Sequence, residues 1–349
     1  MTAGDGDRRA ALPARLRALG DRRGVLATRA RVLRALHCFF EARGFLHLET
    51  PARVTCPGLE PHLVPFPAGG GRWLITSPEL HLKKALVALA AAGDPSPRVY
   101  EVARVFRDDE TGPWHLPEFT MVEWYRAGEG LDALVRDLEE LLPRLAEAAG
   151  ADPRDASGTD LTLPFERLSV RDAFARYAAI DLAACRERDD LAAEVRRLGL
   201  PVDPGDTWDD LFFRAFLDRV EPRLGRARAT ILEEYPASQC ALARVREDPG
   251  FPVALRFELY AGGVELANAF DELTDPVEQR RRHEADRAAR RAAGLAVPDL
   301  DEEFLAALEA GMPPAAGIAL GFDRLLAVLL GLPGASEVVA FPPGGRGSS

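Results

Sequence analysis

The sequence predicts an α+β fold in which an antiparallel sheet of six or seven strands is flanked by helices. Residues 99–108 and 118–126 are apolar segments joined by a polar loop, and residues 254–272 contain two apolar runs around Gly262-Gly263. Neighbouring segments of this kind pair as antiparallel strands. Residues 131–149 are expected to form one of the helices that flank the sheet, and residues 29–42 carry apolar side chains at helical spacing, which predicts an amphipathic helix.

The remaining elements follow in order along the chain. Helices are expected at 29–42, 78–92, 275–294 and 325–331, and short strands at 45–51 and 72–77. Gly44 ends the first helix and Pro51 the first strand, because glycine and proline interrupt regular structure. Residues 151–228 are rich in charge and broken by proline and glycine. We therefore expect a helical insert there, within a catalytic domain that spans 26–345.

Composition and charge restrict the class of protein. The 349 residues are 47% hydrophobic and carry a formal net charge of −11, which disfavours a general nucleic-acid-binding surface. No apolar run is long enough to span a membrane. The four cysteines lie far apart with no C-x-x-C pair, so a reduced cytoplasmic protein is expected. Residues 1–25 form an arginine-rich arm, either flexible and solvated or a docking patch for an acidic partner.

The segment 254–272 brings acidic residues together. With a two-residue turn, Glu265 lies opposite Tyr260, and Glu258 shares the face of Tyr260 because side chains alternate along a strand. Two neighbouring carboxylates repel unless a cation lies between them, and oxygen ligands suit Mg²⁺ bound to a nucleotide. Asn268 and Glu272 share a face with each other, and with Glu265 only if a bulge intervenes. The alternative is an exposed hairpin with solvated acids.

Two further segments carry residues suited to ligands. On the strand 118–126, Glu123 and Tyr125 share a face with Phe119, and an acid beside a phenol can hold an ammonium group. Arg107, at the end of the preceding strand, presents a planar fork of donors that suits a phosphate. Arg324 ends the run 317–324, where glycines allow close approach of a ligand to the backbone.

Together these segments resemble the three signature motifs of class II aminoacyl-tRNA synthetases. The resemblance covers residues 29–51 for the first motif, 106–125 for the second and 317–324 for the third. The runs Thr76-Ser-Pro-Glu79, His115 to Tyr125 and Glu265 to Glu272 are similar to those of lysyl-tRNA synthetases. The resemblance extends over roughly residues 26–342 and implies the class II catalytic fold.

The first motif begins near residue 29, which leaves no room for an N-terminal anticodon-binding domain. Such a short core is similar to the lysyltransferases that modify elongation factor P. This resemblance implies ATP-dependent activation of lysine, with (R)-β-lysine as the preferred isomer. It also implies transfer to a lysine side chain of elongation factor P, a homodimer formed through 29–51, and no tRNA anticodon reading. Ala319 stands where lysyl-tRNA synthetases have glycine, and its methyl group would reshape the amino-acid pocket.

The resemblance also implies a role for each matching residue. ATP is expected against Arg107, Asp109, His115, Phe119, Glu265 and Arg324, with Arg107 and Arg324 as the catalytic residues and Mg²⁺ on Glu258 and Glu265. The amino acid is expected against Glu79, Glu123, Tyr125, Asn268, Glu272 and Ala319. Its carboxylate attacks the α-phosphate in line and pyrophosphate leaves. Catalysis then consists of positioning and charge stabilisation, without a protein nucleophile.

The sequence departs from the family pattern at four positions. Asp109 stands where the second motif has glutamate, and its side chain is one methylene shorter. Leu116 replaces an asparagine, and Ala267 and Ala269 replace glycines around Asn268. These changes bear on the fine geometry of the site.

Two alternatives remain open from the residues. One is the same activation chemistry with another acceptor, a carrier protein or a tRNA. The other is a non-catalytic regulatory subunit. Such subunits lose the motif arginines and metal-binding acids, whereas all four are present here. The residues do not separate α-lysine from (R)-β-lysine.

Overall fold

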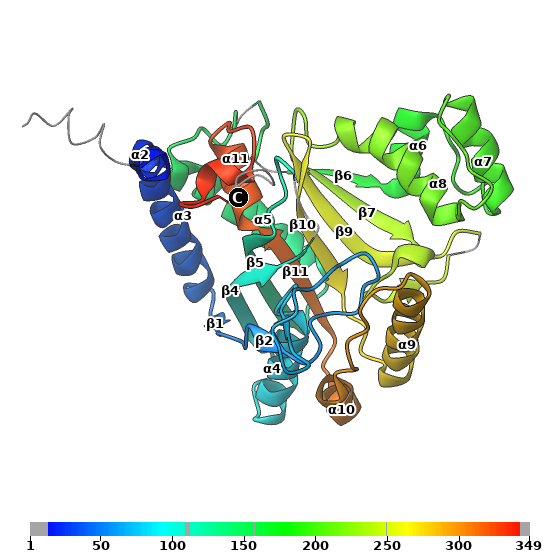
Figure 1. Ribbon diagram of the computed structural model, residues 1–349, viewed down its shortest axis with the longest axis horizontal. Coiled ribbons are helices and arrows are strands. Elements are labelled where there is room, and N and C mark those ends of the chain that lie inside the picture. Colours follow the sequence, from blue (N-terminus) through cyan, green and yellow to red (C-terminus); the bar gives the residue numbers. More distant parts are fainter. Residues whose placement is uncertain (1–12, 109–111, 157, 163, 249, 343–349) are drawn as a thin grey trace, which may run out of the picture.

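A nine-stranded sheet organises the described part of the chain. The structure, a computed structural model, describes residues 13–108, 112–156, 158–162, 164–248 and 250–342 (Figure 1). The strand order is β1 (Leu46–His47), β4 (Arg98–Phe106), β5 (Glu118–Ala127), β11 (Ala315–Gly321), β10 (Val264–Asp271), β9 (Val253–Ala261), β7 (Thr230–Pro236) and β6 (Glu166–Ser169), with β8 (Val245–Arg246) paired to β9. A separate pair is formed by β2 (Arg53–Val54) and β3 (Trp73–Leu74).

The sheet is larger than the six or seven strands expected from the sequence. Its central strands are antiparallel as predicted, but the outer pairs β1–β4 and β6–β7 are parallel. β1 is the short strand that forms within the predicted strand 45–51, whereas β6, β7 and β8, with four, seven and two residues, were not predicted. Strands as short as β6 and β8 show too little alternation to be recognised from sequence.

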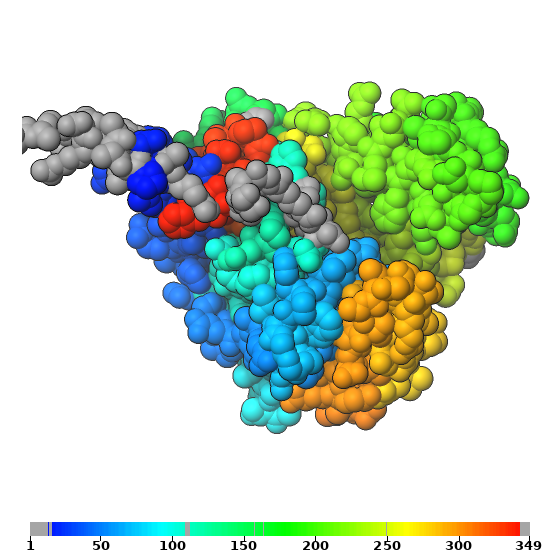
Figure 2. All heavy atoms as spheres, in the orientation of Figure 1, coloured from blue at the N-terminus to red at the C-terminus, as the bar shows by residue number. Residues whose placement is uncertain are grey.

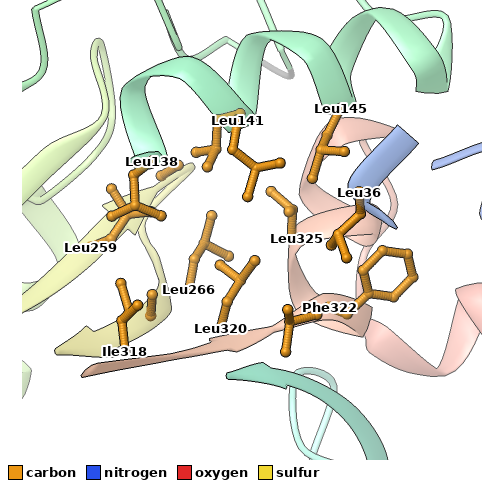
Figure 3. Packing of buried hydrophobic residues seen from close by; sticks show 14 of the residues in the cluster. Leu36, Leu138, Leu141, Leu145, Leu259, Leu266, Ile318, Leu320, Phe322 and Leu325 are labelled. Carbon is orange, nitrogen blue, oxygen red and sulfur yellow. The ribbon is translucent and has the colours of Figure 1, made fainter. Parts of the chain in front are cut away.

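One face of the sheet is covered by α3 (Arg23–Glu41), α5 (Leu131–Ala149) and α11 (Phe322–Leu329). The predicted helix 131–149 matches α5, whose Leu138, Leu141 and Leu145 are fully buried. They meet Ile318 and Leu320 of β11 (Figure 3). Burying each leucine contributes about 1.5–3 kcal/mol, so this core fixes the strands that carry the functional side chains on the opposite face.

The other helices lie around the opposite face and the far end of the sheet. Near the lower end in Figure 1 are α4 (Glu79–Ala91), α9 (Pro276–Ala292) and α10 (Glu302–Gly311). At the far end are α6 (Val170–Ala178), α7 (Arg188–Arg197), α8 (Trp208–Ala215), η1 (Phe216–Val220) and η2 (Glu221–Arg223). The short turns η3 (Ala237–Gln239) and η4 (Ala335–Val338) follow β7 and α11 along the chain.

The region predicted as a helical insert has its own small core. Phe174 and Phe212 stack with ring centroids 4.7 Å apart, and Phe216 stacks on Phe212 at 5.8 Å. The insert is not purely helical, because it contributes β6, which pairs with β7 and ties the region to the main sheet. The insert and the sheet therefore share one framework.

The described part of the N-terminal arm is helical, unlike the flexible arm that was expected. Residues 14–21 form α2 (Ala14–Asp21), and α3 begins at Arg23. Arg22 donates to the backbone oxygens of Ser336 at 3.0 Å and Val339 at 3.1 Å, which docks this segment onto the C-terminal region. Residues 1–12 lie outside the described part. Among the described helices, none has the length and apolar character needed to cross a membrane.

Candidate active site

A hollow of about 780 Å³ lies on the sheet face opposite α5. Strands β5, β9, β10 and β11 form its floor, and α8, the loop 57–63 and the start of α11 form its walls. Arg290 of α9 holds the loop by donating to the backbone oxygens of Glu60 and Leu63 at 2.8 and 2.9 Å. Figure 2 shows this loop, in light blue, against α9 in orange. The volume falls in the range of sites that enclose a small-molecule ligand.

Four residues form a continuous row across the floor of this hollow. Glu123 of β5 is the register partner of Ala319 on β11, which in turn pairs with Asn268 on β10. Asn268 pairs with Glu258 on β9. All four residues line the hollow. Residues far apart in sequence thus meet because the strand order 5-11-10-9 aligns them.

A β-bulge determines which acids share this face. Glu265 lies opposite Tyr260, as the two-residue turn predicts, and the register shifts between Glu265 and Ala267. The extra residue turns Asn268 to the same side as Glu265, and both line the hollow. The sequence predicted that Asn268 and Glu265 would share a face only if a bulge lay between them, and the structure contains that bulge. Glycines at 262 and 263 form the turn with φ of 65° and 77°, a conformation that glycine adopts without strain.

Glu258 is held by three donors. Its Oε2 accepts from the hydroxyls of Tyr235 at 2.5 Å and Tyr260 at 2.7 Å, and its Oε1 accepts from Arg256 at 2.5 Å. Glu265 is less constrained, with Arg324 Nη1 3.6 Å from its carboxylate. Burial, followed by the charge of Glu258, raises the pKa of Glu265 to about 7. A carboxylate whose pKa is raised by a neighbouring acid lies in a site that favours a cation between the two.

The acid pair fits Mg²⁺ that is bound together with phosphates. Among the described residues, no group of three or more His, Cys, Asp or Glu side chains could hold a metal ion. Mg²⁺ retains water and commonly takes one or two carboxylates together with substrate phosphate oxygens. Glu265 is the more available carboxylate, because Glu258 already accepts three hydrogen bonds.

The residues expected to hold ATP converge at one end of the hollow. Arg107, His115, Phe119 and Arg324 all line it. The Arg107 guanidinium lies over the Phe119 ring at 5.3 Å from the centroid, and Arg324 donates to the backbone oxygen of Trp114 at 3.0 Å. Two guanidinium groups beside an aromatic ring suit a nucleotide triphosphate. Asp109, which was assigned to the same group, lies outside the described residues.

The opposite end of the hollow is acidic. Glu123 is 1% exposed and accepts from Ser77 Oγ at 2.5 Å and from the Tyr125 hydroxyl at 3.0 Å. Burial, followed by the charge of Glu79, raises the pKa of Glu123 to about 8. Glu79 and Glu123 both line the hollow. An ammonium group placed here would be desolvated but paired, as buried charges require.

Glu272 is placed differently from the sequence-based expectation. It was assigned to contact the amino acid, yet it does not border the hollow, and its Oε2 lies 2.5 Å from Lys83 Nζ. Lys83 was missed. The signal was available, because Glu79 and Lys83 stand four residues apart on a predicted helix and such pairs face each other. Lys83 is one of only two lysines in the chain.

Gly317 allows this end of the site to close. A side chain at this position would overlap the Tyr125 ring and the carboxylate of Glu272. The third motif therefore uses glycine for close approach of side chains from β5 and the end of β10, rather than for a turn. Arg256 was also missed. It stands two residues from Glu258 on the same strand and donates to Asn268 Oδ1 at 3.1 Å.

The sequence matches the family described as tRNA synthetases class II (D, K and N) over residues 16–344. The chain belongs to this family. It is similar to an elongation factor P–(R)-beta-lysine ligase of Proteus mirabilis, at 39% identity over 91% of this chain and 94% of the relative. Ligases of the same name from Edwardsiella ictaluri and Mannheimia succiniciproducens are 39% and 38% identical, over 90% and 91% of this chain and 94% of each relative.

Three of the four departures from the class II synthetase pattern lie within the described residues: Ala267 and Leu116 line the hollow, and Ala269 does not. Ala269 is fully buried in the main core, on the opposite side of the strand from Asn268. Leu116 is 4% exposed and packs with Ala335 and Val339. The alanine at 269 thus alters core packing, whereas Ala319 alone adds a methyl group to the row between Glu123 and Asn268.

Proposed function

We propose that this chain activates lysine with ATP, with (R)-β-lysine as the preferred isomer, and transfers the lysyl group to a lysine side chain of elongation factor P. One observation supports this most strongly: a single hollow joins an acidic end built on Glu79 and Glu123 to a phosphate-binding end built on Arg107 and Arg324. The similar proteins are named elongation factor P–(R)-beta-lysine ligases.

The chain's residues divide the first step between them. Glu79 and Glu123 hold the side-chain ammonium, and Asn268 faces the other polar groups of the amino acid. The substrate carboxylate oxygen attacks the α-phosphorus and pyrophosphate leaves. Arg107 and Arg324 stabilise the charge that develops on the phosphates. Mg²⁺ held by Glu265 and Glu258 supplies further charge neutralisation at the phosphate oxygens when bound.

The second step forms an amide. The amine of the acceptor lysine attacks the carbonyl carbon of the lysyl-adenylate, the bond to phosphate oxygen breaks, and AMP leaves. The amine loses a proton to solvent. The chain contributes position rather than a nucleophile, because holding the adenylate in place makes the reaction effectively unimolecular once the acceptor has docked.

Two measurements test this proposal. The first is ATP–pyrophosphate exchange with α-lysine and with (R)-β-lysine, and exchange with neither would overturn the activation step. The second is the intact mass of elongation factor P after incubation with enzyme, ATP and each isomer. A gain of one lysyl group is expected. A factor whose acceptor lysine is replaced by arginine is the matched control and gains nothing. Exchange without transfer would keep the activation chemistry and reject this acceptor.

A further inference from the structure

A buried ammonium already lies behind the acidic end of the hollow. Lys83 of α4 is 1% exposed, and its Nζ is 2.5 Å from Glu79 Oε1 and 2.5 Å from Glu272 Oε2. Glu79 lines the hollow, whereas Lys83 and Glu272 do not. The amine-binding wall thus has two layers, with Glu79 and Glu123 in front and Lys83 with Glu272 behind.

The charges of this cluster are unequal. Three carboxyl groups, from Glu79 of α4, Glu123 of β5 and Glu272 after β10, share one resident ammonium. Tyr125 of β5 donates to Glu123, and on the α9 side His283 is neutral, since burial and then Lys83 lower its pKa to about 4. With every carboxyl ionised the cluster carries −2, which exceeds the charge of a single side-chain ammonium.

Protons compensate for this imbalance when the hollow is empty. Burial, opposed next by Lys83, still leaves the pKa of Glu272 raised to about 8, and that of Glu123 is raised as well. Burial lowers the pKa of Lys83, but the charges of Glu272 and Glu79 outweigh burial and raise it. Lys83 therefore stays charged while the carboxyls around it share protons.

We propose that Lys83 is a positioning residue whose fixed ammonium balances Glu272 and orients Glu79, so that the wall presents charge for one substrate ammonium. This inference rests on the proposed function, because it assigns the amine end of the same site. Lys83 acts through Glu79 and does not touch the substrate. Glu272 consequently serves to hold Lys83 rather than to bind the amino acid.

Removing the ammonium has a defined consequence. In Lys83→Met a side chain of similar length remains, but the three carboxyls lose their counter-charge and take up protons more readily. A substrate ammonium must then displace those protons. We expect KM for lysine to rise about tenfold or more near neutral pH, which corresponds to a pKa change of one unit. The acid limb of kcat/KM should move to higher pH by a similar amount, with the KM for ATP unchanged.

The adjacent lysine provides a matched control. Lys84 lies on the same helix and pairs with Asp301 at 3.0 Å and Glu303 at 2.9 Å, away from the hollow. Lys84→Met removes the same charge and should leave the KM for lysine and the pH profile of exchange at their wild-type values.

Norleucine lacks the side-chain ammonium, so the ratio of kcat/KM for lysine to that for norleucine measures how strongly the enzyme selects the ammonium group. In Lys83→Met this preference for lysine should fall by about tenfold or more.

A double variant separates charge from packing and guards against misfolding. Lys83→Met with Glu272→Gln removes one charge of each sign, so the acid limb should return toward the wild-type pH. If Lys83→Met kept the wild-type KM, or if the double variant kept the shifted profile, the charge-balance role would be rejected. Wild-type enzyme assayed in parallel reports on the proposed function separately, because absence of its exchange would reject the activation of lysine before Lys83 is considered.

Discussion

Ala319 is the residue whose substitution most directly tests how the pocket selects between lysine isomers. Its methyl group lies between Glu123 and Asn268, its register partners on the two neighbouring strands. We expect Ala319→Gly to shift selectivity toward α-lysine by about tenfold, because one methyl group in a pocket is worth 10–200-fold in discrimination. The ratio of kcat/KM for the two isomers in pyrophosphate exchange measures this. An unchanged ratio would show that the methyl group does not set isomer preference.

Glu123 links the site to the pH dependence of folding. Its pKa is raised from 4.5 to about 8 in the folded chain, so the folded state binds more protons than the unfolded state between these values. The protonated Glu123 therefore stabilises the folded state fully at pH values below its pKa in the unfolded chain, and this stabilisation is lost as the pH rises through about 8. The free energy of unfolding should therefore fall with rising pH, by up to about 1.4 kcal/mol per unit for one group.

Glu123→Gln is the variant that isolates this effect. It cannot ionise, so its melting temperature should vary less between about pH 5 and pH 9 than that of the ligand-free wild type. Added lysine should stabilise the wild type most at the high end of this range, where the ionised carboxylate needs a partner. Parallel melting curves for the two proteins, with and without lysine, provide the measurement. Equal slopes would assign the pH dependence to other groups.

At the scale of elements, the β9–β10 hairpin separates what sequence could predict from what it could not. The Gly262-Gly263 turn and the alternation of side chains placed Glu258 and Glu265 on one face, which the register confirms. The bulge after Glu265 has no residue signature of its own, so the position of Asn268 on that face was left conditional. The three donors to Glu258 come from β7 and β9, and the pairing of β7 with β9 is a long-range contact that local periodicity does not encode.

The hairpin predicts different phenotypes for its two acids. Glu265→Gln should abolish pyrophosphate exchange with little loss of stability, because the ion pair of its carboxylate with Arg324 is long, at 3.6 Å. Glu258→Gln should also lower the free energy of unfolding, by about 1–3 kcal/mol, since it disturbs buried hydrogen bonds from two tyrosines and an arginine. Exchange assays combined with urea unfolding separate the two outcomes. Exchange that survived in Glu265→Gln would contradict its assignment to the metal.

The cluster behind the amine site shows a second limit of sequence reasoning. Motif comparison made both Glu79 and Glu272 substrate contacts. In the structure Lys83 bridges the two carboxylates, and Glu79 lines the hollow whereas Glu272 does not. The sequence predicts that 78–92 is a helix, but whether Lys83 points outward or into the core depends on how this helix packs on β4 and β5 and meets Glu272 after β10, which are long-range contacts. The spacing of Glu79 and Lys83 thus predicted their ion pair, but it did not predict that the pair would be buried behind the amine site.

At the scale of the whole molecule, the surface expected to form a homodimer is largely covered by the chain itself. The apolar stripe of the predicted helix 29–42 was expected to be exposed in a monomer. Instead Val32, Leu36 and Phe40 are fully buried within the chain against its own core. What remains exposed is β1, an edge strand, whose Leu46 is 47% exposed. An apolar side chain on an open strand edge favours pairing with a second copy.

We therefore expect a dimer of this chain to form through β1 rather than through the stripe of α3. Leu46→Arg places a charge on the open edge and should yield monomers at micromolar concentration, whereas wild type should sediment as a dimer. Leu16→Arg is the matched control, since Leu16 is similarly exposed at 46% but lies on α2. Sedimentation velocity distinguishes these outcomes. A wild-type monomer would reject the dimer, and a dimeric Leu46→Arg would move the interface to another surface. Because β1 pairs with β4, which is joined to β5 in the floor of the site, loss of the dimer should also lower exchange activity.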